Sequence, residues 1–223
     1  MAKPKVPPIA ERKPVYIAMP KGTVKFSSLE KPDTMFSDQA PKWQLVMTYS
    51  QEEIQEFEDK VEALAQEWLK EVQSKPKGKG TKLNDLPFKE DKDKEGNETG
   101  LVKVTLARPA YRKDTDPQTG ESKDILRPIP MFDAKGNPVS NVKAYRGAVV
   151  RPSIALNFYA SPNAKIGVGI SFRLEAVQVI KASGGARDAA GYGFQNEAGE
   201  ESDVAESADG DAPESDYEEG QDL

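Results

Sequence analysis

Histidine and cysteine are both absent from this chain of 223 residues. Without cysteine there is no thiol nucleophile, no disulfide and no thiolate metal site, and without histidine there is no imidazole base and no usual zinc or haem ligand. An enzyme would have to use hydroxyl, carboxylate or lysine groups. No glycosidase-like pair of carboxylates stands out, so a hydrolase is the weakest of the hypotheses that the residues allow. We expect no enzyme, no cofactor and no metal.

Two segments resemble ligand sites but are incomplete. The basic glycine loop Lys75–Lys82 departs from the Walker pattern, because Gln73 replaces the first glycine and Gly80 replaces the Ser or Thr. This loop either contacts phosphates or is a solvated linker. The acidic run around Asp91 and Asp93 has part of the EF-hand spacing but lacks the closing Glu, so a charged, flexible loop is the better interpretation.

Cations and tyrosines recur through the second half of the chain. They are Lys103, Arg108, Tyr111, Arg112, Lys113, Arg127, Tyr145, Arg151, Tyr159, Lys165 and Arg173. A groove lined in this way suits single-stranded nucleic acid, because cations follow the phosphates and aromatic rings stack on unpaired bases of any sequence. Each residue alone is more often simply solvated, and the hypothesis depends on their interleaving.

Charge is distributed very unevenly along the chain. Of 37 acidic residues, 12 lie after Phe194, where there is no Lys or Arg, so the remaining 25 oppose 31 basic residues in the body. The body is therefore basic and the tail strongly acidic, which indicates an anionic partner for the body and a tail that competes with it or recruits something basic. The tail has too few large apolar residues to fold by itself.

The elements that must position these groups follow from periodicity. Residues 1–14 form a proline-rich basic arm, and Val15–Met19 and Gly22–Leu29 are expected to be strands. Alternation over Lys42–Tyr49 predicts a half-buried strand with Trp43 in the core rather than in a ligand platform. After a capping box at Ser50, apolar residues recur at helical spacing, which predicts one amphipathic helix over about 51–73. We expect it to pack on a sheet rather than to bind a membrane or a partner helix.

A flexible loop is expected over about 75–98, and the second half of the chain has almost only strand signals. The fold class is therefore mainly β, a small closed or nearly closed β architecture with one inserted helix. In Gly147–Ser161 the residues Val150, Ile154, Leu156 and Phe158 should face the core, with Arg151, Asn157 and Tyr159 opposite. In the next strand Gly167, Gly169 and Ser171 would let a ligand or another backbone approach closely. The alternation slips near Glu175, which predicts a bulge.

This order of features resembles the single-stranded DNA-binding proteins of tailed bacteriophages. The resemblance covers nearly the whole chain and is most specific over Ser153–Lys181, with the Gly-Lys loop running into Leu86-Pro87-Phe88, a Gly-Gly exit and the acidic tail. It implies an OB fold, a five-stranded barrel with possible extra strands, over residues 15–182, and a flexible linker and tail over 183–223. It also implies sequence-independent binding of single strands in replication, recombination and repair, strand annealing, and possible homodimers.

The resemblance also implies specific roles for individual residues. Tyr159 matches a DNA-stacking tyrosine after the penultimate strand, Lys3 falls in the basic arm, and Tyr111–Lys113 match a basic binding segment. The tail would contact phage DNA polymerase and other replication proteins through Glu214, Asp216, Tyr217, Glu218, Glu219, Asp222 and Leu223. Tails of this class often end in an aromatic residue, whereas this chain ends in Leu223, which leaves Leu223 or Tyr217 as substitutes.

Two functions from different classes therefore stay open. The first is a single-stranded DNA-binding protein regulated by its own tail. The second is an acidic-tailed chaperone or adaptor that binds basic proteins, with the barrel as a scaffold. No signal-like or membrane-spanning segment is present in the sequence, so we expect the protein in the cytoplasm of the bacterial host cell.

Overall fold

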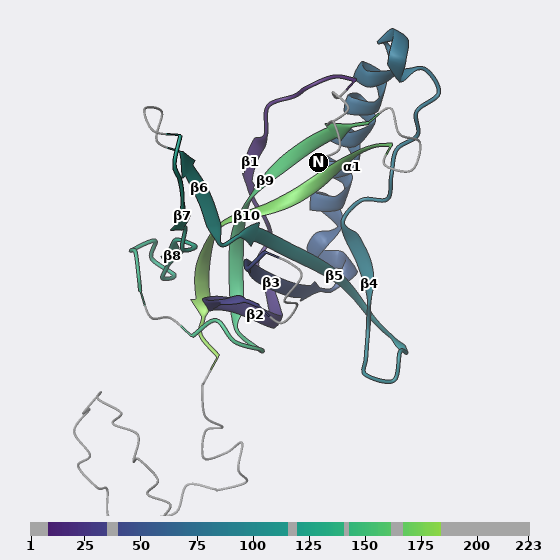
Figure 1. Cartoon of the computed structure of the whole chain (residues 1–223). Helices are drawn as coiled ribbons and strands as arrows, with labels where there is room; N and C mark the ends of the chain where they lie inside the picture. The colour runs from purple at the N-terminus through teal and green to yellow at the C-terminus, as the bar shows by residue number, and fades with distance from the viewer. Residues whose placement is uncertain (1–8, 35–39, 116–119, 141–142, 162–166, 184–223) are drawn as a thin grey trace, which may run out of the picture. The chain divides into compact units, whose positions relative to one another are not determined.

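The computed structural model describes residues 9–34, 40–115, 120–140, 143–161 and 167–183 (Figure 1). The chain divides into two units, 1–186 and 187–223, and all described residues lie in the first. The predictions for Lys3, Lys165, the Gly-Gly exit at 184–185 and the acidic tail fall outside the described residues.

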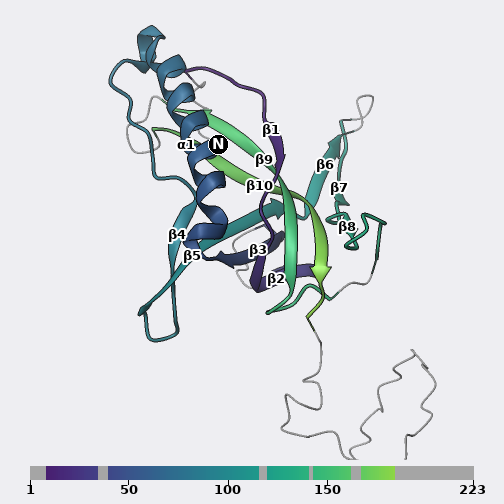
Figure 2. The same ribbon diagram turned by 180° about the vertical axis from the view of Figure 1, so that it is seen from behind.

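Five strands close into a barrel (Figures 1 and 2). They are β2 (Gly22–Asp33), β3 (Lys42–Tyr49), β5 (Glu98–Pro109), β9 (Val149–Ala160) and β10 (Val168–Lys181). Each pairs antiparallel with its neighbours in the order β2-β3-β5-β10-β9-β2, except that β5 and β10 are parallel. The prediction of a mainly β, five-stranded OB-type barrel is confirmed.

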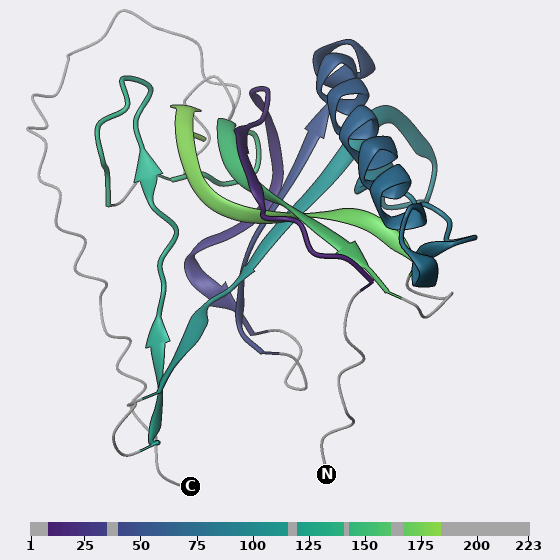
Figure 3. The ribbon, with the colours of Figure 1, turned by 90° about the horizontal axis from the view of Figure 1, so that it is seen from above.

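Additional strands extend this barrel. The strand β1 (Val15–Ala18) lies along β9, β4 (Phe88–Lys92) along β5, and β8 (Met131–Phe132) along β10. A separate hairpin, β6 (Tyr111–Thr115) with β7 (Ser122–Leu126), stands on the side of the barrel away from the helix (Figures 1 and 3). The prediction of a loop over about 75–98 was wrong in part. This segment contains the 3-10 helix η1 (Pro76–Gly78) and the strand β4.

The single α-helix of the described residues, α1 (Gln51–Gln73), begins at the predicted capping box. The Ser50 side chain accepts from the Glu53 amide, and the Glu53 carboxylate accepts from the Ser50 amide, so two otherwise unpaired donors are satisfied. The apolar stripe of α1 is buried, and Phe57 contacts the rings of Phe88 and Phe172 edge to face. No helix among the described residues is long and apolar enough to cross a membrane.

The predicted facing of the strands is confirmed. Trp43 is 3% exposed and in the core, and in β9 the residues Val150, Ile154 and Leu156 are buried. A register shift between Leu174 and Ala176 produces the predicted bulge, after which Val177 and Val179 turn inward. The outer and inner faces of β9 and β10 are therefore assigned residue by residue.

Candidate nucleic-acid surface

The strand register aligns one residue from each barrel strand across the outer surface. Ala155 of β9 is opposite Arg173 of β10, which is opposite Ala107 of β5; Ala107 is opposite Gln44 of β3, and Gln44 is opposite Ser28 of β2. Residues directly opposite each other in neighbouring strands share a face. We call this set the transverse row. Its members are small or polar apart from Arg173, which is its only cation.

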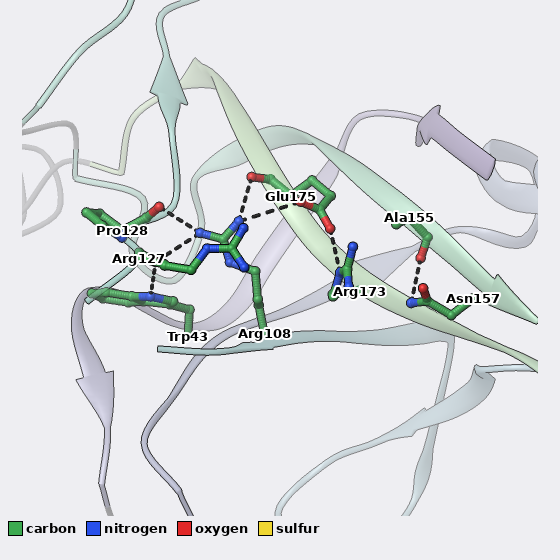
Figure 4. Close-up of polar contacts among 8 residues, drawn as sticks. All are labelled: Trp43, Arg108, Arg127, Pro128, Ala155, Asn157, Arg173 and Glu175. Atoms are coloured by element: carbon green, nitrogen blue, oxygen red, sulfur yellow. Dashed lines mark hydrogen bonds and ion pairs between the residues drawn. The ribbon is translucent and has the colours of Figure 1, made fainter. Parts of the chain in front are cut away.

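Arg173 is held by a carboxylate that two arginines share (Figure 4). Its Nε lies 2.6 Å from Glu175 Oε1, while Arg108 Nη1 lies 3.6 Å from Glu175 Oε2. The Arg173 side chain is 39% exposed, and only its Nε has a hydrogen-bond partner among the described residues. Among the described residues its two Nη groups have no hydrogen-bond partner, and a phosphate would supply one.

Arg108 lies instead in the interior, at 6% exposure. Its Nη2 donates to the carbonyl oxygens of Arg127 and Pro128 at 2.9 and 2.7 Å, and its Nη1 donates to the carbonyl of Glu175 at 3.4 Å. Burial lowers the pKa of Arg108, as do the neighbouring arginines, although Glu175 acts in the opposite direction. The structure thus uses Arg108 to join β5, the segment after β7 and the bulge of β10, and we leave it out of the proposed binding surface.

The hairpin β6–β7 is exposed along both strands. Tyr111 is opposite Leu126 and Arg112 is opposite Ile125, so Tyr111 and Lys113 point to one side and Arg112 to the other. Arg112 lies 3.9 Å from Asp114, with both side chains more than half exposed, and such a pair contributes little. These cations remain available to an external anion.

Tyr159 lies on the outer face of β9, where its side chain contacts Gly169 and Asn84. A Cβ added to Gly169, its partner on β10, would lie 2.4 Å from the Tyr159 Oη, so the tyrosine side chain crosses over that glycine. Asn84 Nδ2 donates to Tyr159 Oη at 3.2 Å. Gly167 and Gly169 were expected to admit a ligand or another backbone. The described close approaches come from within the chain, from Tyr159 at Gly169 and from Asn84 and Lys82 at Gly167.

The other predicted residues are spread more widely. The side chain of Arg127 is exposed, while its carbonyl accepts from Trp43 Nε1 at 2.7 Å. Lys103 is half-buried beside Thr48 on β3 and Lys89 on β4, and Arg151 is exposed opposite Gln178.

Tyr145 is 41% exposed, and a hydrogen bond with Glu30 raises its pKa. The structure brings Arg108, Arg127 and Arg173 together, whereas Lys103, Tyr145 and Arg151 lie apart from them.

Phe26 is an exposed aromatic that the sequence pattern did not reveal. It is 44% exposed on β2 and lines two hollows, one of 320 Å³ beside Tyr145 and one of 670 Å³ beside Arg146. Val24 has the same parity but is buried, because a register shift between the two residues turns Phe26 outward. Simple alternation places Phe26 inside, and no residue in the segment signals the bulge.

Asp91, from the acidic loop, forms a structural ion pair. Its carboxylate accepts from Lys25 Nζ and from the Thr99 hydroxyl. Burial raises the pKa of Asp91, but the two hydrogen bonds and the charge of Lys25 outweigh it and leave the pKa below its ordinary value. Among the described residues no group of three or more acidic side chains is placed to hold a metal ion.

The closed barrel, its strand order and its inserted helix define a fold class, the OB-type barrels. Among solved structures this fold is shared with single-stranded DNA-binding proteins of bacteriophages. For gp2.5, encoded by bacteriophage T7, the TM-score is 0.57 at 20% identity, over 85% of this chain and 100% of that one. No family model and no curated protein matches the sequence.

The protein from bacteriophage Enc34 gives a second set of matches. Its structure in complex with single-stranded DNA has a TM-score of 0.54 at 13% identity, covering 76% of this chain and 88% of that one. A C-terminal truncation of the same protein has a TM-score of 0.52 at 12% identity, covering 81% and 99%. At these identities the likeness shows a common fold.

Proposed function

We propose that this protein binds single-stranded DNA without sequence specificity and without catalysing a reaction, in phage replication, recombination and repair within the bacterial cytoplasm. The observation that carries the proposal is the outer face of the barrel, where the transverse row places the partly exposed guanidinium of Arg173 on a strip of small and polar residues. The fold shared with phage proteins described as single-stranded DNA-binding, one of them solved with DNA, supports it.

Binding would combine electrostatic contacts with stacking. Arg173 and the exposed cations Arg112 and Lys113 would contact phosphates, and Tyr159 would accept an unpaired base on the outward side of its ring. Small side chains between these groups leave room for the sugar-phosphate backbone. Such contacts do not read base edges, so the protein would bind any sequence and could promote annealing.

The acidic tail would regulate this surface. Its 12 acids face no basic residue within the tail, whereas the body has a net positive charge. Because the tail belongs to the same chain as the barrel, its effective concentration at the surface can reach the millimolar range, so it would compete with DNA phosphates continuously. The same acids would recruit phage DNA polymerase and other replication proteins, and homodimerisation remains part of the proposal.

A salt titration tests the binding mode. Fluorescence anisotropy with labelled oligothymidine should give a log affinity that falls linearly with log salt, with a slope of about −0.7 per phosphate, hence roughly −2 to −4 for three to five contacts. A duplex of equal length should bind more weakly. An affinity that does not change with salt contradicts electrostatic capture.

Two substitutions that remove the same charge locate the contact. Arg173→Gln should weaken binding and reduce the steepness of the salt dependence by about 0.7. Lys60→Gln, on the exposed face of α1, should leave both quantities unchanged. Equal effects of the two substitutions would mean that net charge, not the transverse row, determines binding.

Removing the tail separates this proposal from an adaptor function. A chain ending at Phe194 should bind oligothymidine more tightly than the full chain, most strongly at low salt, because salt screens both interactions. An adaptor that uses only its tail would lose its protein partners and gain no affinity for DNA. Equal affinities of the two chains at low salt would remove the regulatory role of the tail.

A further inference from the structure

The strand β1 presents one strongly exposed aromatic residue. Tyr16 is 65% exposed, the highest value among the exposed large apolar side chains of the described residues. Its neighbours Val15 and Ile17 pack against the core, so the alternation of β1 places Tyr16 on the outer face. The sequence had assigned it no role, since Val15–Met19 was interpreted only as a strand.

The register brings Tyr16 to the end of the transverse row. Ala155 is opposite Tyr16 on one side and opposite Arg173 on the other. Ala155 is completely buried although it belongs to neither cluster of core residues. Tyr16 and Arg173 therefore flank one alanine, with their Cα atoms about 10 Å apart across two strand spacings.

Tyr159 lies on the same outer face of β9, four residues beyond Ala155 and so about 13 Å along the strand. Two tyrosines and one partly free guanidinium thus share a surface. This is the combination that binds single-stranded nucleic acid, in which rings stack on bases while a cation contacts the phosphates. The surface extends beyond the five barrel strands onto β1.

The backbone around Tyr16 is held against β9 by hydrogen bonds within the chain. Ile9 N donates to the Ala160 carbonyl at 3.1 Å, and Met19 N donates to the Pro152 carbonyl at 2.9 Å, which ties both ends of the segment to β9. Between them, the guanidinium of Arg12 lies 4.7 Å from the centroid of the Phe158 ring. A side chain on a backbone that is already ordered loses less entropy when it binds.

We propose that Tyr16 is a base-stacking residue and that β1 forms one edge of the single-stranded DNA surface. The proposal rests on the function proposed above. It requires an aromatic ring at this position, not a hydroxyl group or a charge.

The test uses the full chain and two labelled probes of the same length, oligothymidine and an abasic deoxyribose-phosphate oligomer. Tyr16→Ala should weaken binding to oligothymidine by about 5- to 150-fold, the range of one stacked base. Tyr16→Phe should bind like the parent chain. On the abasic probe, which offers phosphates but no bases, all three proteins should bind equally. Thermal unfolding should be nearly unchanged because Tyr16 is mostly exposed.

The outcomes are distinguishable. If the parent chain binds neither probe, the proposed function fails and this inference with it. If the parent binds oligothymidine and Tyr16→Ala binds it equally well, only the role of Tyr16 is refuted. Equal losses on both probes would also refute stacking. Should Tyr16→Ala unfold at a lower temperature, Tyr16→Leu, which keeps the bulk of the side chain without a ring, gives the decisive comparison.

Discussion

Arg108 lies at the end of β5 and Arg112 at the start of the next strand, β6. Although they are close in sequence, one side chain is buried and the other is exposed. Arg108 is 6% exposed and donates to three backbone carbonyls, while its charge is balanced by Glu175. Arg112 is exposed on a hairpin that has solvent on both sides. The same residue type serves the fold in one place and is available to a ligand in the other.

This difference shows that the availability of donors, and not residue type, selects the candidate binding groups. A buried guanidinium that donates to three carbonyls has little left to offer a phosphate, and moving it outward would remove one donor from each of these carbonyls and one cation from Glu175. Arg173 is intermediate, because its side chain is partly exposed and, among the described residues, only its Nε has a hydrogen-bond partner.

Replacing the two arginines tests that contrast most strongly. Arg108→Met should reduce the free energy of unfolding by about 2–4 kcal/mol, because it leaves buried carbonyls without donors. Arg112→Gln should change it by less than about 0.5 kcal/mol and instead weaken oligothymidine binding. Urea unfolding and anisotropy measure both. If Arg108→Met is as stable as the parent and loses DNA binding, the assignment of the two arginines is reversed.

The neighbours Phe158 and Tyr159 give the same contrast within one strand. Phe158 contacts Trp68 edge to face, with ring centroids 5.8 Å apart, so Phe158→Ala should cost about 3 kcal/mol of stability. Tyr159→Ala should leave the barrel folded and weaken oligothymidine binding by about 1–3 kcal/mol. Thermal unfolding and anisotropy separate the two effects. A Tyr159→Ala chain that melts early while Phe158→Ala is stable but inactive would show that the facing of β9 is inverted.

A smaller change perturbs Tyr159 without removing it. In Gly169→Ala the new Cβ would overlap the tyrosine ring, which must rotate away from Asn84. We expect a stability change within about 1 kcal/mol, since alanine loses less backbone entropy than glycine on folding and this partly offsets the overlap. The loss of DNA affinity should be no larger than that of Tyr159→Ala. In a Tyr159→Ala background the same substitution should have no further effect on binding, and an additive loss would show that Gly169 acts by another route.

Much of the fold could be predicted because local signals agree with it. The Ser50 capping box and the helical spacing of apolar residues predicted α1. The alternation of apolar and polar residues predicted which faces of β3, β9 and β10 are buried, and a break in that alternation predicted the bulge at Glu175. The strand β4 was missed because the charged run around Asp91 looks solvated, whereas Asp91 is neutralised by Lys25, 66 residues away in sequence. A long-range ion pair leaves no local trace.

For the candidate site, the sequence predicted the types of residue involved but not which of them are exposed and available to a ligand. A sequence shows that Arg108, Arg112 and Arg173 are cations, but not that the first is buried and donates to the carbonyls of residues 127, 128 and 175. Phe26 and Tyr16 were missed for different reasons. A bulge turned Phe26 outward, and the role proposed for Tyr16 depends on a register that aligns β1 with β9.

The central claim is that the outer face of the barrel binds single-stranded DNA. Ultraviolet cross-linking of the full chain to oligothymidine, followed by mass spectrometry of the cross-linked peptides, tests it most directly. We predict cross-links in β9, β10 and the β6–β7 hairpin, suppressed by high salt, and none in α1, which lies on the opposite side from the hairpin (Figure 3). Cross-links concentrated on α1, or none above the level of a duplex control, would contradict the account.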